Sequence, residues 1–161
     1  MRKDLLSEKN WRLCVESMPI FGIDLIILSK HNGILMGKRI NEPAKDKLFV
    51  PGGRVYKNET REEAFTRIVK NETGLNLVLS TSTHFGIFEH FYDTNFISEK
   101  NQTTHYIIEA RLIELTSDIK LINLKEQHYD SKWINIEDCS NDNVHYYSQQ
   151  YLYKVRNYIK G

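Results

Sequence analysis

The side chains best suited to chemistry are carboxylates and arginines in and around the segment 53–75. This segment reads GRVYKNETREEAFTRIVKNETGL and carries Glu59 and Glu72. Divalent cations such as Mg²⁺ prefer oxygen ligands, so Glu72, which closes an otherwise apolar helix face, is a candidate metal ligand. Arg39 and Arg54 lie on either side of a glycine-rich turn. Guanidinium groups bind diphosphates well, so this pattern predicts metal-assisted chemistry on a phosphate compound.

A loop followed by a helix must position these groups. Gly52 and Gly53 allow a tight backbone that approaches a ligand closely. Thr60 and Glu63 fit a capping box, and Gly74 stands where a left-handed C-terminal cap is expected. Four residues share one helix face through their i, i+3, i+4, i+7 spacing: Phe65, Ile68, Val69 and Glu72. On the helix alone, a solvated helix rich in carboxylates explains the pattern about equally well.

The rest of the chain reads as strands around this helix, with one further helix at each end. We predict helices at 7–18 and 146–160, strands at 20–28, 34–39, 77–90, 103–115 and 133–134, a polar loop at 91–102, and a connection at 120–129. This order predicts an α/β (α+β) protein with an α/β/α sandwich around a mixed central sheet, in a single domain over 1–161. Asp24 interrupts an apolar strand, so it is either hydrogen-bonded structurally or part of a site.

Composition excludes several classes of function. Hydrophobic residues make up 40% and charged residues 27%, and the net charge of +1 argues against bulk attraction to nucleic acid or to a membrane. Cys14 and Cys139 show neither metal spacing nor a disulfide framework, which favours reduced thiols. No run is long enough to span a bilayer, and the polar N-terminus is unlike a signal peptide. We therefore expect a cytoplasmic protein.

The segment 53–75 resembles the Nudix box. That pattern is a Gly, five residues, Glu, seven residues, Arg-Glu, an aliphatic residue, any residue, Glu-Glu, any residue, Gly and an aliphatic residue. Ile68 and Asn71 stand where the box has glutamates. Over about residues 11–150 the chain is similar to the GDP-mannose mannosyl hydrolase branch, which lacks the same two acids. The resembling segments are FGID at 21–24, GKR at 37–39, FVPGGRV at 49–55, HFYD at 90–93, THY at 104–106, EQH at 126–128 and DNVH at 142–145.

The resemblance implies hydrolysis of GDP-mannose, with GDP-glucose as a further candidate substrate. Water would attack the anomeric carbon with inversion, releasing GDP and free sugar. One Mg²⁺, replaceable by Mn²⁺, would be held by Glu72, the Gln127 side chain and the Gly52 carbonyl. His128 would be the general base, since an unperturbed imidazole titrates near neutral pH.

The resemblance also implies substrate contacts. Arg39, Arg54 and Tyr106 would bind the diphosphate, and Asp24 would lie near the sugar and the Arg39 guanidinium. Two further residues are open to two interpretations each. His90 either binds substrate or lines the pocket wall. Trp11 either stacks on guanine, across a dimer, or packs in the core.

Two alternative functions and one assembly question stay open on the sequence. A conventional pyrophosphatase would recruit Glu59 or Glu63 as extra metal ligands. A nucleotide-sugar binding module without turnover would explain why Ile68 and Asn71 replace two glutamates of the box. The apolar stripe of the helix at 7–18 must dock, either on its own domain or on a second copy, because so short a helix is marginal alone. The family resemblance and this helix lead us to expect a homodimer in which residues 1–19 contribute to the interface.

Overall fold

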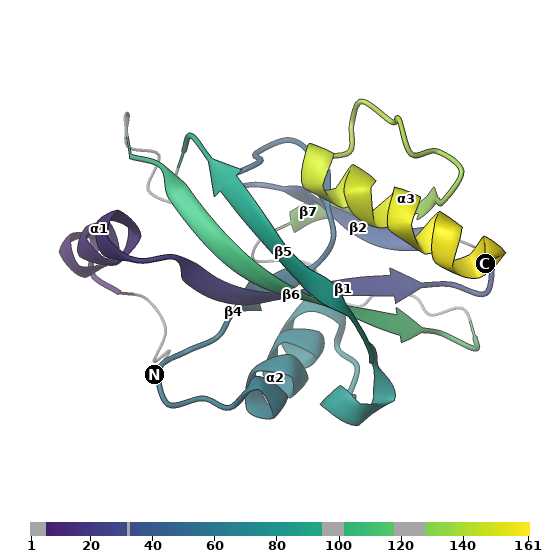
Figure 1. The fold of residues 1–161 in the computed structure, drawn as a ribbon, viewed down its shortest axis with the longest axis horizontal. Helices are drawn as coiled ribbons and strands as arrows, with labels where there is room; N and C mark the ends of the chain where they lie inside the picture. The colour runs from purple at the N-terminus through teal and green to yellow at the C-terminus, as the bar shows by residue number, and fades with distance from the viewer. Residues whose placement is uncertain (1–5, 32, 95–101, 118–127) are drawn as a thin grey trace.

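Two helices sandwich one sheet. The computed structural model describes residues 6–31, 33–94, 102–117 and 128–161, with only the main chain described at 128 and 129. Helix α2 (Arg61–Thr73) and helix α3 (Tyr146–Lys160) lie on opposite faces of the sheet (Figure 1). The predicted α/β/α sandwich with a mixed central sheet is therefore confirmed.

The sheet combines one parallel pair with antiparallel pairs. Over the described residues it has seven strands in the order β3-β2-β1-β6-β5, with β4 paired to β1 and β7 paired to β2. β1 and β6 run parallel, and the other pairs are antiparallel. The strands are β1 (Ile20–Leu28), β2 (Gly33–Arg39), β3 (Leu48–Phe49), β4 (Gly52–Arg54), β5 (Thr83–Tyr92), β6 (Thr104–Glu114) and β7 (His128–Asn135).

Strand β1 supplies both hydrophobic cores. Leu25 and Ile27 belong to the core beneath α2, whereas Ile26 and Leu28 belong to the core beneath α3. Successive side chains of a strand point to opposite faces, and burial on both faces explains why the strand is almost entirely apolar. By the same alternation Asp24 lies on the α3 face. The one polar residue inside β1 therefore points toward the C-terminal helix.

Helix α2 begins and ends as predicted. The Thr60 hydroxyl accepts from the Glu63 N–H, the Glu63 carboxylate accepts from the Thr60 N–H, and Gly74 adopts the left-handed conformation with φ 75°. Its buried residues are Ala64, Phe65, Ile68, Val69 and Thr73. The predicted apolar face is thus the face that packs on the sheet.

Helix α1 (Glu8–Ser17) lies apart from the sandwich at one end of the molecule (Figure 1). Ser7 caps it as predicted, but none of its residues is fully buried. Trp11 is half-buried, whereas Met18 is exposed, so within one chain the predicted apolar stripe is covered only in part. No helix in the described ranges is long and apolar enough to cross a membrane.

Two strand predictions had wrong boundaries. The predicted strand at 77–90 began too early, because a short 3₁₀ turn, η1 (Leu79–Thr81), precedes β5. Strand β7 is longer than the predicted 133–134 and starts inside the segment predicted as a connection. Its residues are mostly polar, so their own pattern gives no strand signal. Their pairing with β2, from Gly33 opposite Asn135 to Arg39 opposite His128, defines the strand.

Candidate active site

Two adjacent glycines in β4 contact both faces of the sheet: Gly52 lies against Asp24, and Gly53 lies against Ile68 of α2. In the β1–β4 ladder, Gly52 lies opposite Asp24 and Gly53 lies opposite Ile23. A Cβ on Gly52 would lie 2.6 Å from Asp24 Oδ1 and 2.7 Å from the Ile23 carbonyl oxygen. A Cβ on Gly53 would lie 3.1 Å from Ile68 Cγ1 of α2. Only a main chain without side chains fits between Asp24 and the helix.

Asp24 is a buried carboxyl group with one strong partner. It is 6% exposed, and the Tyr151 hydroxyl donates to its Oδ2 at 2.8 Å. Burial disfavours the charged form and raises the pKa of Asp24 to about 7, although the Tyr151 hydrogen bond and the Arg39 guanidinium act in the opposite direction. A carboxyl group that titrates near neutral pH beside a glycine turn is typical of functional sites.

The two predicted arginines lie near one tyrosine. Arg39 is half-buried, its Nε donates to the Pro43 carbonyl at 2.8 Å, and its guanidinium lies 5.8 Å from the Phe49 ring centroid. Burial raises the pKa of Tyr106, and the charges of Arg39 and Arg54 partly offset that rise. Both cations therefore lie within electrostatic range of Tyr106. The neutral phenol is a hydrogen-bond donor beside two positive charges, which suits an anionic ligand.

The predicted metal ligands occupy different elements. Glu72 is half-buried and lies one turn after Ile68 on α2. Gly52 supplies a main-chain carbonyl at the turn, and Gln127 lies outside the described residues. Within the described ranges, no three His, Cys, Asp or Glu side chains group as a metal site. A donor set of one carboxylate and neutral oxygens fits a single Mg²⁺, which binds proteins through one or two carboxylates.

Glu59 and Glu63 serve as scaffold. Glu59 accepts from Arg67 Nε at 2.6 Å and from Arg67 Nη2 at 2.8 Å, and these hydrogen bonds lower the pKa of Glu59. Arg67 Nη2 also donates to the Arg54 carbonyl at 2.8 Å. Glu63 accepts from the Thr60 N–H at 2.8 Å. Both carboxylates thus hold the loop and the start of α2.

The proposed base lies beside Arg39 in the sheet. His128 opens β7, and its main chain pairs with Arg39 where the β2–β7 register shifts. Its side chain lies outside the described residues, as Gln127 does. The ladder nevertheless brings the position predicted for the base next to a position predicted to bind the diphosphate.

His90 and Trp11 lie in different surroundings. His90 is 2% exposed, and its ring stacks on Tyr147 with centroids 3.9 Å apart. Burial, with a smaller contribution from His145, lowers the pKa of His90 to about 3, so its imidazole is neutral. The Trp11 ring centroid lies 5.7 Å from the guanidinium carbon of Arg54. The structure therefore places His90 inside the protein and Trp11 beside a predicted diphosphate-binding residue.

Sequence reasoning assigned no role to Tyr151 or His145. Tyr151 lies within the helix predicted at 146–160, and a tyrosine in a helix gives no sign in the sequence of where its hydroxyl points. His145 is the N-cap of α3, and its Nδ1 accepts from the Tyr147 N–H at 3.3 Å. Burial lowers the pKa of His145, and so do the charges of Arg39 and Lys47. Histidine is not among the usual N-cap residues, so no local signal marked it.

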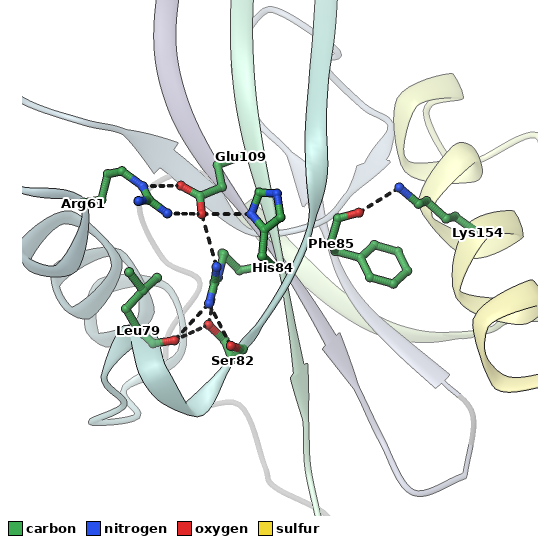
Figure 2. Close-up of polar contacts among 8 residues, drawn as sticks. Arg61, Leu79, Ser82, His84, Phe85, Glu109 and Lys154 are labelled. Carbon is green, nitrogen blue, oxygen red and sulfur yellow. Dashed lines mark hydrogen bonds and ion pairs between the residues drawn. The ribbon is translucent and has the colours of Figure 1, made fainter.

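A second polar cluster, centred on the buried Glu109 and Arg111, lies on the α2 face and is structural (Figure 2). Glu109 is 1% exposed and accepts from Arg61 at 2.7 and 2.6 Å, from Arg111 at 3.2 Å and from His84 at 3.3 Å. Burial acts to raise the pKa of Glu109, but the hydrogen bonds of Arg61 and His84 lower it overall. Arg111 also donates to carbonyls of the η1 segment. Every member has a partner, so the cluster ties η1, β6 and α2 together.

Comparison with known proteins defines the family. The family model described as NUDIX domain matches residues 18–154, so the chain belongs to the NUDIX family. It is 34% identical over 147 residues to the low-salt glycan biosynthesis protein Agl8 of Haloferax volcanii, covering 91% of this chain and 88% of that protein. It is also 46% identical over 67 residues to an ADP-ribose pyrophosphatase of Methanocaldococcus jannaschii, covering 42% of this chain and 38% of that one.

Solved structures agree on the fold. The MutT protein of Methanosarcina mazei superposes with a TM-score of 0.68 at 18% identity, covering 90% of this chain and 99% of that one. At this identity the likeness establishes the fold alone. The chain is a Nudix hydrolase by family and architecture, and its substrate must be argued from its own residues.

Proposed function

We propose that this protein hydrolyses GDP-mannose to GDP and free mannose by water attack at the anomeric carbon with inversion. One observation carries the proposal. Glu59 is bound by Arg67 and Glu63 caps α2, so neither carboxylate serves as an extra metal ligand without breaking the scaffold. Cleavage inside a diphosphate by several metal ions needs such carboxylates. Departure of a whole GDP group assisted by one ion does not.

The position of Ile68 supports the same conclusion. The Nudix box has a glutamate at this position, but Ile68 is buried and its Cγ1 packs against Gly53. A carboxylate there would be buried beneath the helix at a high desolvation cost. Ile68, which replaces the glutamate of the box, therefore packs against the glycine turn. The metal ligand that we assign on α2 is Glu72.

Each side chain has a task in the proposed reaction. Arg39, Arg54 and Tyr106 stabilise the negative charge that grows on the departing diphosphate. Asp24 accepts a hydrogen bond from a sugar hydroxyl and holds the sugar beside the Gly52 turn. His128 removes the proton from the attacking water on the face opposite the leaving group. A bound Mg²⁺, held by Glu72, the Gly52 carbonyl and Gln127, would supply positive charge to the leaving group, and Mn²⁺ could replace it.

One relative adds support from outside the site. The Haloferax volcanii protein is named for glycan biosynthesis, which suits a family branch that acts on activated sugars. GDP-glucose, whose leaving group is the same GDP, is the second sugar nucleotide that we expect to be cleaved.

Product analysis tests the proposal. Incubation with GDP-mannose and Mg²⁺ should yield GDP and mannose by ³¹P NMR, and β-mannose should appear first from the α-linked substrate by ¹H NMR. Formation of GMP and mannose 1-phosphate would overturn attack at carbon. Tight binding by calorimetry with no product after prolonged incubation would instead identify a binding module.

A conventional pyrophosphatase is the second candidate. The match to an ADP-ribose pyrophosphatase over 67 residues favours it. It predicts AMP and ribose 5-phosphate from ADP-ribose, in the same assay, at a rate above that on GDP-mannose. It also predicts that Glu59→Gln abolishes activity through loss of metal.

The assembly proposed with this function is a homodimer in which α1 contributes to the interface. Leu13 is 64% exposed and Met18 is also exposed, so α1 carries apolar area that a second copy would cover. Sedimentation at micromolar concentration should give a dimer, and Leu13→Asp should shift it toward monomer. A monomer in the parent protein would contradict this assembly.

A further inference from the structure

Three buried polar side chains form a continuous hydrogen-bonded chain across the α3 face of the sheet. The Tyr151 hydroxyl lies 2.8 Å from Asp24 Oδ2 and 3.3 Å from His90 Nε2. Tyr151 is 0% exposed, His90 is 2% and Asp24 is 6%. They come from α3, β5 and β1, so the C-terminal helix reaches the candidate site through one phenol.

Above about pH 7, where Asp24 is ionised and can only accept, counting protons fixes the direction of each hydrogen bond. A tyrosine hydroxyl carries one hydrogen, and Tyr151 donates it to Asp24. The second bond then needs a hydrogen from His90, so His90 Nε2 is protonated and donates to the phenol oxygen. The imidazole is held in place, because it stacks on Tyr147 at 3.9 Å with an interplanar angle of 16°. Tyr151 thereby selects one tautomer of His90.

The same phenol orients the Asp24 carboxylate. Oδ2 is occupied by Tyr151, and Oδ1 is the oxygen that lies against the Gly52 turn, 2.6 Å from where a Cβ would stand. Side-chain hydrogen bonds go mostly to the main chain or to water. Here the partners are Asp24, which the resemblance places near the sugar, and His90, a candidate substrate contact or pocket-wall residue, and a purely structural tyrosine does not require either.

We propose that Tyr151 is a positioning residue of the active site, which turns Asp24 Oδ1 toward the sugar and keeps His90 as the Nε2–H tautomer. The effect on turnover rests on the proposed function, because it takes Asp24 to touch the sugar. The effect on His90 does not, since it concerns the protein without substrate.

Nitrogen NMR on ¹⁵N-histidine-labelled protein tests the tautomer directly. At a pH well above 7, where Asp24 is ionised, the His90 signals, assigned by their loss in His90→Gln, should show Nε2 protonated and Nδ1 unprotonated. Tyr151→Phe should shift them, whereas Tyr147→Phe should not, because within the described residues the Tyr147 hydroxyl bonds only to the Phe91 main chain. A His90 protonated on Nδ1, or signals unchanged in Tyr151→Phe, would overturn the proposal. If Tyr151→Phe does not fold, Asp24→Ala serves instead, because it removes the acceptor and frees the Tyr151 hydroxyl to donate to His90 Nε2. Unchanged His90 signals in that variant would overturn the proposal equally.

A double-mutant cycle tests the route to catalysis. We expect Tyr151→Phe and Asp24→Asn each to lower kcat by roughly tenfold or more, and the double variant to be no slower than Asp24→Asn, because one acts through the other. Tyr147→Phe should stay within about twofold of the parent. Fully multiplicative losses would contradict positioning through Asp24. If the protein cleaves another nucleotide derivative, the cycle is run on that substrate, while the NMR result is unaffected.

Discussion

Arg67 donates two hydrogen bonds to Glu59, at 2.6 and 2.8 Å, and a third to the Arg54 carbonyl at 2.8 Å. The Arg67 guanidinium thus joins α2 to the turn that carries Arg54, which is predicted to bind the diphosphate. Glu59 and Arg67, two residues of the Nudix box, thus have a structural role in holding the loop against the helix. The assignment of a single metal ion depends on this relationship.

Glu59→Gln should therefore reduce stability and leave metal affinity nearly unchanged. Hydrogen bonds to charged groups contribute about 1.5–3 kcal/mol, and partial exposure of Arg67 places the expected loss at the lower end. Urea denaturation measures the loss, and Mn²⁺ titration followed by electron paramagnetic resonance measures the affinity. A fall in Mn²⁺ affinity as large as that of a Glu72 variant would show that Glu59 is a ligand.

Glu72→Gln should weaken Mn²⁺ binding by roughly tenfold or more, since it removes the one carboxylate we assign to the ion. Activity should fall with it and recover in part at high metal concentration. Glu62→Gln, which changes an exposed carboxylate on the same helix, is the matched control, and this variant should bind Mn²⁺ like the parent. Equal behaviour of the two variants would remove Glu72 from the site.

Gly52→Ala should be inactive and less stable. Its Cβ would stand 2.6 Å from Asp24 Oδ1 and 2.7 Å from a main-chain oxygen, so the carboxylate or the strand must move. Overpacking of this kind costs about 1–3 kcal/mol. Gly33→Ala is the control, because its nearest neighbours lie at 3.4 Å, an ordinary contact. Normal turnover by Gly52→Ala would show that Asp24 need not lie where the turn holds it.

Glu109→Gln should destabilise the protein in a pH-dependent way. It leaves the buried Arg111 without its carboxylate, and breaking a buried pair costs about 3–5 kcal/mol. Because folding lowers the pKa of Glu109 below its ordinary 4.5, its stabilisation is complete above that pH and is lost as pH falls through the folded value.

Urea denaturation of both proteins from neutral pH to below pH 4.5 checks this expectation. The difference in unfolding free energy between parent and Glu109→Gln should be constant above that pH and shrink below it. Glu137→Gln, which alters an exposed ion pair with Lys160, should change stability little. If the difference in unfolding free energy between parent and Glu109→Gln does not depend on pH, the variant has lost packing contacts and no charge interaction.

His128→Ala should lower kcat by about 10²–10⁴-fold with little change in KM, because a general base acts in the transition state. Steady-state kinetics on GDP-mannose measure both constants. His31→Ala, at an exposed turn, is the control. A rise in KM at constant kcat would make His128 a binding residue.

Local signals predicted the fold well, and long-range contacts explain what they missed. The capping box at Thr60, the Gly74 cap and the apolar run of β1 depend on neighbouring residues, and the structure has them at the predicted positions. Strand β7 depends on pairing with β2, a partner distant in sequence, so its polar residues concealed it.

The candidate site also contains residues that the sequence predicted and residues that only the structure shows. Residue type and motif order pointed to Arg39, Arg54, Tyr106 and Asp24. The structure places Asp24 opposite Gly52 and all three charged groups within electrostatic range of Tyr106. The role of Tyr151 could not be predicted, because its hydroxyl meets Asp24 across 127 positions of sequence. Spacing alone also cannot show that Glu59 is engaged by Arg67, which is a matter of side-chain geometry.

The position of the bond that breaks tests the central claim most directly. Hydrolysis of GDP-mannose in ¹⁸O-labelled water, quenched early and analysed by mass spectrometry, should place the label on carbon 1 of mannose and leave GDP unlabelled. Label in any phosphate product, whether GDP, GMP or mannose 1-phosphate, would show attack at phosphorus and contradict the account.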